Sequence, residues 1–241
     1  MRSTSQETDS VRSLMRHAWD NVETVRAVAR AQYYDVGEDA QPSRHPFWRF
    51  LDPTALFAFD NQPEPWRLRA WWKSPDAWRY AERSPAGTEE EYVAVGHHWT
   101  YRMNGQQMAY GVFPVKELPL VLSVGSPQWT AYENCQRVGW LNPALWVDSM
   151  SLTVLEHARI QDYEVFHVLA YPDPDALRTQ RGLFDPTQDL EWVTAGHVFQ
   201  LWVNAYTGFF RRLSAEADNG RAWDILIDIL EINQPLDGGI F

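Results

Sequence analysis

The sequence predicts an α+β fold in which helices pack on an antiparallel β-sheet. Two observations carry this prediction. Residues 66–105 are short segments of alternating character separated by turn-forming groups, as in an antiparallel meander. The last third of the chain repeats this design, while helical spacing is clear only near the N-terminus and after residue 142. We take residues 1–241 as a single domain, because no repeat or change of composition marks a boundary.

The N-terminal region predicts a helix followed by a strand. Asp9 or Ser10 can cap the helix, and its apolar residues recur at helical spacing: Val11, Leu14, Met15, Ala18 and Trp19. Such an amphipathic helix is expected to lie on a sheet. In residues 24–36 the apolar residues recur with a period of two, which predicts a long strand. Residues 37–46 are typical of a polar loop, and residues 47–60 predict a short helix within an irregular segment.

The meander at residues 66–105 predicts four strands with two unlike faces. Successive side chains of a strand point to opposite sides. Trp66, Leu68 and Trp72 therefore share an apolar face, whereas Arg67 and Arg69 lie on the charged face. Most aromatic residues of the later strands are also expected on a wide aromatic face, which something apolar has to cover.

The remaining chain predicts further strands and one short helix. Strands are expected at residues 108–115, 152–160, 163–171, 197–204, 209–216 and 221–231. Residues 116–138 resist assignment because two prolines interrupt them. Asn142-Pro143 favours a helix over residues 144–150, since proline is tolerated at the first helical position. Residues 172–190 are typical of a polar loop, and Asp218-Asn219-Gly220 is a strong hairpin signal.

Composition excludes several classes of function. The net charge of −11 argues against binding to nucleic acid or to anionic lipid surfaces, which basic residues mediate. The single cysteine, Cys135, cannot form an internal disulfide. No run of about eighteen apolar residues predicts a membrane span. The N-terminus has no signal-peptide pattern, so we expect a cytoplasmic location, or an exported protein if the native N-terminus is missing.

Motifs for common enzyme chemistry do not occur in the sequence. It contains no nucleophile elbow, no phosphate-binding glycine-rich loop and no His-Glu-x-x-His motif, so we expect no enzymatic activity, no metal and no cofactor. Residues 89–91 are three glutamates after a turn, interpreted as a solvated start of a strand. Arg211 and Arg212 could anchor an anion through the one that faces inward. We interpret the pair instead as residues that keep a strand soluble.

Several motifs resemble the outer-membrane lipoprotein carrier (LolA-like) superfamily. They are WWKSPDAWRY at residues 71–80, VGHHWTY at residues 95–101, LWVN followed by TG at residues 201–208, and NQPL at residues 233–236 with Phe241 after it. The resemblance covers about two thirds of the chain. Ser74 occupies the position before the turn proline where the carriers have an arginine. Because of this serine and because the N-terminus has no signal-peptide pattern, the chain resembles a relative without a signal peptide rather than the carrier itself.

The resemblance implies a strongly curved, unclosed half-barrel of about ten or eleven antiparallel strands, with two or three helices covering its concave face. It also implies that this face binds acyl chains without enzymatic turnover, or that the domain serves as a sensor. The residues expected to line the face are Trp66, Leu68, Trp72, Trp78, Tyr80, Trp99, Tyr101, Phe199, Leu201, Ile225 and Ile227.

Two alternatives to ligand binding stay open. The aromatic residues can form a closed core, in which case the domain meets a protein partner through its outer surface. A carbohydrate-active enzyme would require two carboxylates facing each other within the aromatic face.

Overall fold

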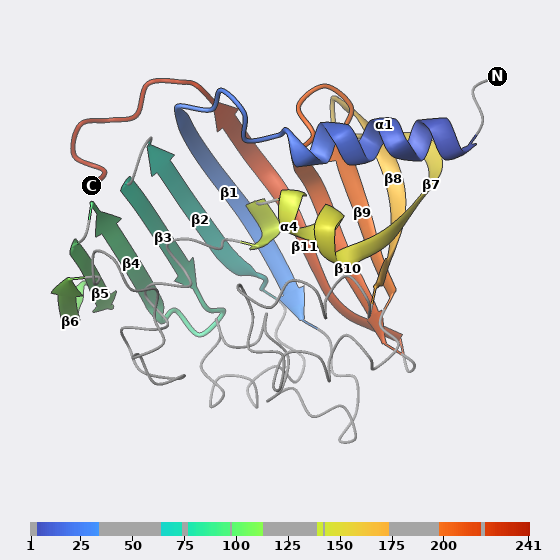
Figure 1. The fold of residues 1–241 in the computed structure, drawn as a ribbon. Coiled ribbons are helices and arrows are strands. Elements are labelled where there is room, and N and C mark those ends of the chain that lie inside the picture. Colours follow the sequence, from blue (N-terminus) through green and yellow to red (C-terminus); the bar gives the residue numbers. More distant parts are fainter. Residues whose placement is uncertain are drawn as a thin grey trace. The chain divides into compact units, whose positions relative to one another are not determined.

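The fold is described from a computed structural model, for residues 4–33, 64–73, 77–96, 98–112, 139–141, 143–173, 198–217 and 220–241. Four expectations fall outside these ranges: those for residues 37–46, 47–60 and 116–138, and that for most of the loop at 172–190. The described strands form one eleven-stranded sheet with the order β6-β5-β4-β3-β2-β1-β11-β10-β9-β8-β7 (Figure 1). The sheet is unclosed, because β6 and β7 lie at its two ends among the described strands.

The chain divides into two compact units. The first unit comprises Met1–Asp20, Gln32–Asn61 and Gly139–Leu226, and the second comprises Asn21–Ala31, Gln62–Val138 and Ile227–Phe241. The single domain expected from the sequence stays a prediction.

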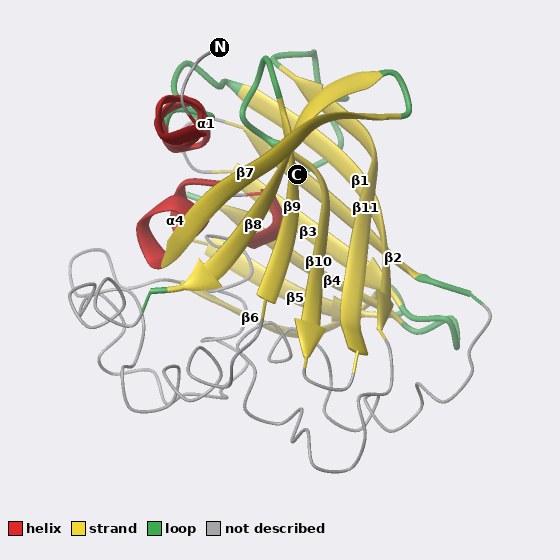
Figure 2. Cartoon of the chain, turned by 90° about the vertical axis from the view of Figure 1, so that its right-hand side faces the viewer, coloured by secondary structure: helices red, strands yellow, loops and turns green. Residues whose placement is uncertain are grey.

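The first unit contains the described helices and the strands after them. Helix α1 is Thr4–Arg16, the 3-10 helix η3 is Gly139–Leu141 and helix α4 is Pro143–Ser149. The strands are β7 Met150–Ile160, β8 Tyr163–Pro172, β9 Val198–Asn204 and β10 Phe210–Ala217, together with the first part of β11, Gly220–Ile232. Helix α1 packs against α4 and β7 (Figure 2).

Helix α1 confirms the predicted apolar stripe but begins earlier than expected. Val11 and Met15 are buried, as the helical spacing indicates. The helix starts at Thr4, so Asp9 and Ser10 lie inside it, and the Ser10 hydroxyl donates to the carbonyl of Gln6 at 2.9 Å. The proposed caps were wrong because the two polar turns before Val11 are also helical. No helix in the described part of the chain is long and apolar enough to cross a membrane.

The second unit contains most of β1 and the meander. Strand β1 is Thr24–Tyr33, β2 is Trp66–Lys73, β3 is Ala77–Arg83, β4 is Glu89–Val95, β5 is His98–Met103 and β6 is Gln106–Val112. Each of these strands pairs antiparallel with the next. The four-stranded meander predicted for residues 66–105 is therefore confirmed. Strand β6 begins directly after the Asn104-Gly105 turn, where both residues have positive φ angles.

Candidate functional site: the aromatic face of the meander

The register of β2 to β5 brings most of the aromatic residues of these strands to one face, here called the aromatic face. Trp72 of β2 pairs with Trp78 of β3, and their ring centroids are 5.9 Å apart. In the middle of the meander, Tyr80 pairs with Tyr92, which pairs in turn with Tyr101. The Tyr92 and Tyr101 rings are stacked with their centroids 4.7 Å apart. Strict alternation along three consecutive hairpins produces this arrangement.

Exposure varies across the aromatic face. Trp66, Leu68, Tyr80 and Trp99 are buried, each with at most 6% of its surface exposed. Trp72, Trp78 and Tyr101 are instead half-buried. Large apolar side chains on one face are therefore partly accessible to solvent, next to others that are fully packed.

Trp99 is held in place by a glycine on the neighbouring strand. It pairs with Gly111 of β6, and a Cβ atom built on Gly111 would lie 2.7 Å from Cζ2 of the Trp99 ring. The indole therefore lies directly on the glycine backbone. Any side chain at Gly111 would displace Trp99, because real Cβ contacts are not this short.

Two carboxyl groups share the aromatic face with three tyrosines. Glu82 of β3 pairs directly with Glu90 of β4. The Tyr80 hydroxyl donates to Oε2 of Glu82 at 2.9 Å. The hydroxyls of Tyr92 and Tyr101 both donate to Oε2 of Glu90 at 3.1 Å. The apolar face thus contains one polar cluster in which every hydroxyl has a carboxyl partner.

Burial changes the protonation of this cluster. Glu82 is only 2% exposed, and its pKa is raised from 4.5 to about 8, with removal from water as the largest cause. The charge of Glu90 contributes to this rise in pKa, whereas the hydrogen bond from Tyr80 opposes it. Burial, followed by the charge of Glu90, also raises the pKa of the Tyr92 and Tyr101 hydroxyls, so both stay protonated donors at neutral pH.

Sequence reasoning missed Tyr92, Glu82 and Glu90 as members of this face. The alternation that places Tyr80 on the aromatic face also places Glu82 there, so the signal was present. Interpreting residues 89–91 as a solvated strand start was wrong. Glu91 is 9% exposed and bound to two arginines, and Glu90 accepts two tyrosine hydroxyls. The acidic run looked solvated because its arginine partners are distant in sequence.

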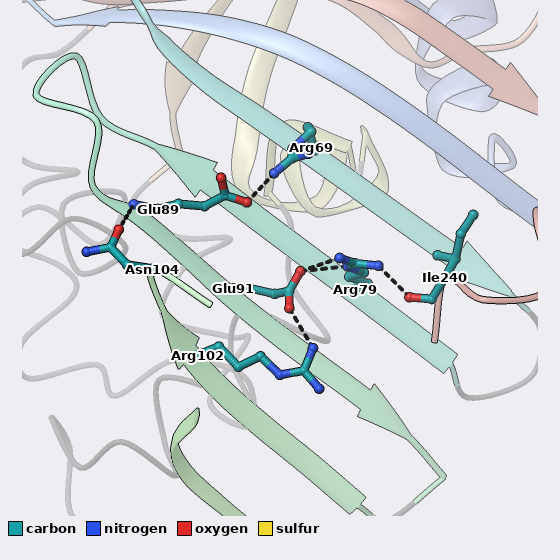
Figure 3. A network of polar contacts seen from close by, with 7 residues as sticks. All are labelled: Arg69, Arg79, Glu89, Glu91, Arg102, Asn104 and Ile240. Atoms are coloured by element: carbon teal, nitrogen blue, oxygen red, sulfur yellow. Dashed lines mark hydrogen bonds and ion pairs between the residues drawn. The ribbon is translucent and has the colours of Figure 1, made fainter. Parts of the chain in front are cut away.

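The opposite face of the meander carries an ion-pair network (Figure 3). Glu91 of β4 accepts hydrogen bonds from Arg79 at 2.7 Å and from Arg102 at 2.9 Å. Arg79 also donates to the carbonyl of Ile240 at 2.8 Å, which fixes the C-terminal segment to β3. Glu89 pairs with Arg69.

Trp71 lies within this network rather than on the aromatic face. The Arg79 guanidinium is 5.1 Å from its ring centroid, and that of Arg69 is 5.7 Å away. Adjacent tryptophans therefore have different surroundings: Trp71 contacts cations, and Trp72 contacts Trp78.

The other predicted lining residues lie elsewhere. Phe199, Leu201 and Ile225 belong to the first unit, where they are buried. Trp146 of α4 contacts Phe199 edge-on, with ring centroids 5.2 Å apart. Ile227 belongs to the second unit and is also buried. The structure thus brings seven of the eleven predicted residues together on the meander: Trp66, Leu68, Trp72, Trp78, Tyr80, Trp99 and Tyr101.

No family model and no curated protein matches the sequence. Among solved structures, the lipoprotein LppX of Mycobacterium tuberculosis aligns with 95% of this chain and 98% of its own, at 9% identity and a TM-score of 0.47. LprF of Mycobacterium bovis aligns over 98% and 97%, at 13% identity and a TM-score of 0.48. A LolA superfamily protein of Nitrosomonas europaea aligns over 95% of both chains, at 10% identity and a TM-score of 0.33. Since all three scores are below 0.5, function has to be inferred from the residues of this chain.

Within the described residues, no group of three His, Cys, Asp or Glu side chains could hold a metal ion. The aromatic face therefore offers apolar area, two carboxyl groups and tyrosine hydroxyls for contacts with a ligand.

Proposed function

We propose that this protein binds a hydrophobic, acyl-like ligand on the aromatic face, without enzymatic turnover. The observation that carries the proposal is the partial exposure of Trp72, Trp78 and Tyr101 beside fully buried aromatic residues. A closed core would leave these rings covered, whereas sites for apolar ligands present aromatic surface with few polar groups. The proposal includes the strongly curved half-barrel, with helices over its concave face, that the motifs imply.

The apolar contacts can supply a useful affinity. Each buried methylene group contributes about 0.8 kcal/mol, so about ten of them give roughly 8 kcal/mol before the costs of ordering the ligand. The ligand would complete the burial of the two indoles that contact each other at Trp72 and Trp78.

Adjacent tryptophans on opposite faces provide a matched test. We expect Trp72→Ala to weaken binding of a fluorescent fatty acid roughly 30-fold, because it removes about 2 kcal/mol of apolar contact. Trp71→Ala should leave the affinity within about twofold, since its ring contacts Arg69 and Arg79 on the other face. Fluorescence titration measures both affinities, and circular dichroism confirms that both variants are folded.

Mass spectrometry of an organic extract of the purified protein should identify the ligand. Equal loss of affinity in the two variants, or no saturable uptake by the wild type, would contradict the proposal. An empty extract together with no uptake would instead fit a protein-interaction module.

The exposed side chains of β6 favour the protein-interaction module as a second candidate function. This strand lies at the end of the described sheet and exposes Met108, Tyr110 and Val112, with Tyr110 75% exposed. Apolar side chains on such a strand suit the addition of a partner strand.

The hypothesis that the protein is a carbohydrate-active enzyme has weaker support. Glu82 and Glu90 do share the aromatic face, as that hypothesis requires. Glu82 is too deeply buried to reach a glycosidic bond, however, and Glu90 already accepts two hydroxyls.

A further inference from the structure

Arg211 lies in the first unit, at an irregularity where β9 meets β10. The pairing of β10 with β9 shifts register between Phe210 and Arg212, so Arg211 is the extra residue of a β-bulge. The bulge follows the turn after β9, which the side chain of Asn204 organises. Its Oδ1 accepts the backbone N–H of Tyr206 at 3.0 Å and that of Thr207 at 2.9 Å. Bulges re-aim side chains, and this one separates Arg211 from the alternation of its strand.

The guanidinium of Arg211 is buried, and two of its three nitrogens have no hydrogen-bond partner, although Tyr163 also interacts with the group through a side-chain hydrogen bond. The residue is 4% exposed, and neither Nε nor Nη1 has a hydrogen-bond acceptor. No ion pair joins it to a carboxylate among the residues that the structure describes. The ring of Tyr163, at the start of β8, lies against it with its centroid 3.3 Å from Cζ. The interpretation of Arg211 as a solubilising residue was therefore wrong.

Arg212, the next residue, differs from Arg211 because its guanidinium has carboxylate oxygens as hydrogen-bond acceptors. It donates to both carboxylate oxygens of Asp224, at 2.9 and 2.5 Å, and lies over the ring of Trp202. Two adjacent arginines thus differ in their anions: Arg212 has a bidentate carboxylate, and Arg211 has none among the described residues.

A buried cation of this kind requires an anion. Burial lowers the pKa of Arg211, but arginine stays charged in proteins. Placing a charge away from water without a hydrogen-bonding partner is strongly unfavourable, and native structures rarely contain such groups. The planar fork of guanidinium donors matches the oxygens of a carboxylate or a phosphate group.

We propose that Arg211 is an oxyanion-binding site that takes a carboxylate or phosphate group at the start of β8 and β10. Tyr163 covers the site. It is 36% exposed and follows the Gln161-Asp162 turn, so rotation of its ring can admit the anion. The site is independent of the ligand proposed for the aromatic face.

Titration of the full chain with inorganic phosphate and with acetate tests this site, using sodium chloride as a control of equal ionic strength. The readouts are the midpoint of thermal unfolding and the NMR signal of the arginine Nε–H groups. We expect saturable stabilisation of the wild type and a shift of one Nε–H signal that is missing from Arg211→Lys. Arg211→Gln should lower the affinity for the anion about tenfold or more, whereas Arg212→Gln should leave the affinity for the anion within about twofold of the wild type.

A short-chain phosphatidic acid distinguishes two sources of the same chemistry. Tighter binding of this lipid than of inorganic phosphate assigns the site to a lipid headgroup, whereas equal affinities assign it to a free anion. The proposal is overturned if neither anion saturates, or if Arg211→Gln responds to phosphate as the wild type does. If Arg211→Gln does not fold, the Nε–H signal of the wild type decides alone.

Discussion

Glu82 shows how the surroundings of a single residue set its charge. The carboxyl group lies between Tyr80 and the cross-strand neighbour Glu90, and its pKa is raised from 4.5 to about 8. At neutral pH it is therefore largely protonated, and the direct pairing with Glu90 then places one charge rather than two on the aromatic face. A neutral carboxyl also fits an apolar surface better than a carboxylate does.

This shift predicts a dependence of stability on pH. The folded state binds the Glu82 proton more tightly than the unfolded chain does. The contribution of this proton to the free energy of unfolding is therefore complete below pH 4.5 and is lost as pH rises to about 8. The loss should be on the order of a few kcal/mol. We expect Glu82→Gln, which cannot ionise, to flatten this part of the profile and to be more stable than wild type above about pH 8.

Urea unfolding at about pH 5 and about pH 9 measures this difference for both proteins. Glu89→Gln is the control, because Glu89 pairs with Arg69 on the opposite face. If Glu82→Gln and wild type lose stability in parallel between these two pH values, Glu82 is not the titrating group.

The turn between β9 and β10 depends on one glycine. Gly208 has a φ angle of +75°, and a Cβ atom at this position would lie 2.3 Å from the backbone oxygen of Leu14 in α1. The same turn buries Phe209, whose ring packs edge-on against Trp19 with the two ring centroids 5.2 Å apart. Helix α1 therefore approaches this turn more closely than any side chain at residue 208 permits.

We expect Gly208→Ala to destabilise the protein by roughly 2–5 kcal/mol, from the unfavourable φ angle and the clash with α1. Thermal unfolding measures the change. Gly87→Ala is the control, since Gly87 also has a positive φ angle, +91°, but a Cβ there meets nothing within 4 Å. Equal destabilisation by both substitutions would show that backbone strain acts alone, without the contact to Leu14.

The elements that the sequence predicts well are those with local signals. The hairpins of the meander follow from turn residues and a period of two, and both are visible over a few residues. The start of α1 could not be predicted, because the polar residues 4–10 carry no apolar stripe. Arg211 was misinterpreted as a solubilising residue for another reason. Alternation assigns faces only while pairing is regular, and a β-bulge interrupts it there.

The organisation of the whole chain is less visible in the sequence. Each of the two units is assembled from three separate stretches, so no single linker with a distinct composition marks a boundary. The partners of Glu91 show the same limit within one unit, because Arg79 and Arg102 come from the strands on either side. Of the predicted ligand-binding residues, strand alternation grouped those of the meander correctly but could not assign Phe199 to the first unit.

The acidic character of the whole molecule leads to a prediction about salt. With a net charge of −11, any ligand held by charge should respond to ionic strength. A neutral apolar probe on the aromatic face should not, so we expect its affinity to stay within about twofold between about 0.05 and 0.5 M sodium chloride. Fluorescence titration at both concentrations measures this. A tenfold change would indicate that charged groups, rather than indole contacts, hold the probe.

The two unlike faces of the meander also limit how its sequence can change in length. Deleting Tyr80 from the middle of β3 would exchange the sides of the residues beyond it in that strand, placing Arg83 on the aromatic face opposite Leu68 and Glu90. Insertions and deletions should therefore be tolerated only in the turns, such as residues 84–88 between β3 and β4. Homologous chains could vary at many single positions of the meander and still have strands of equal length.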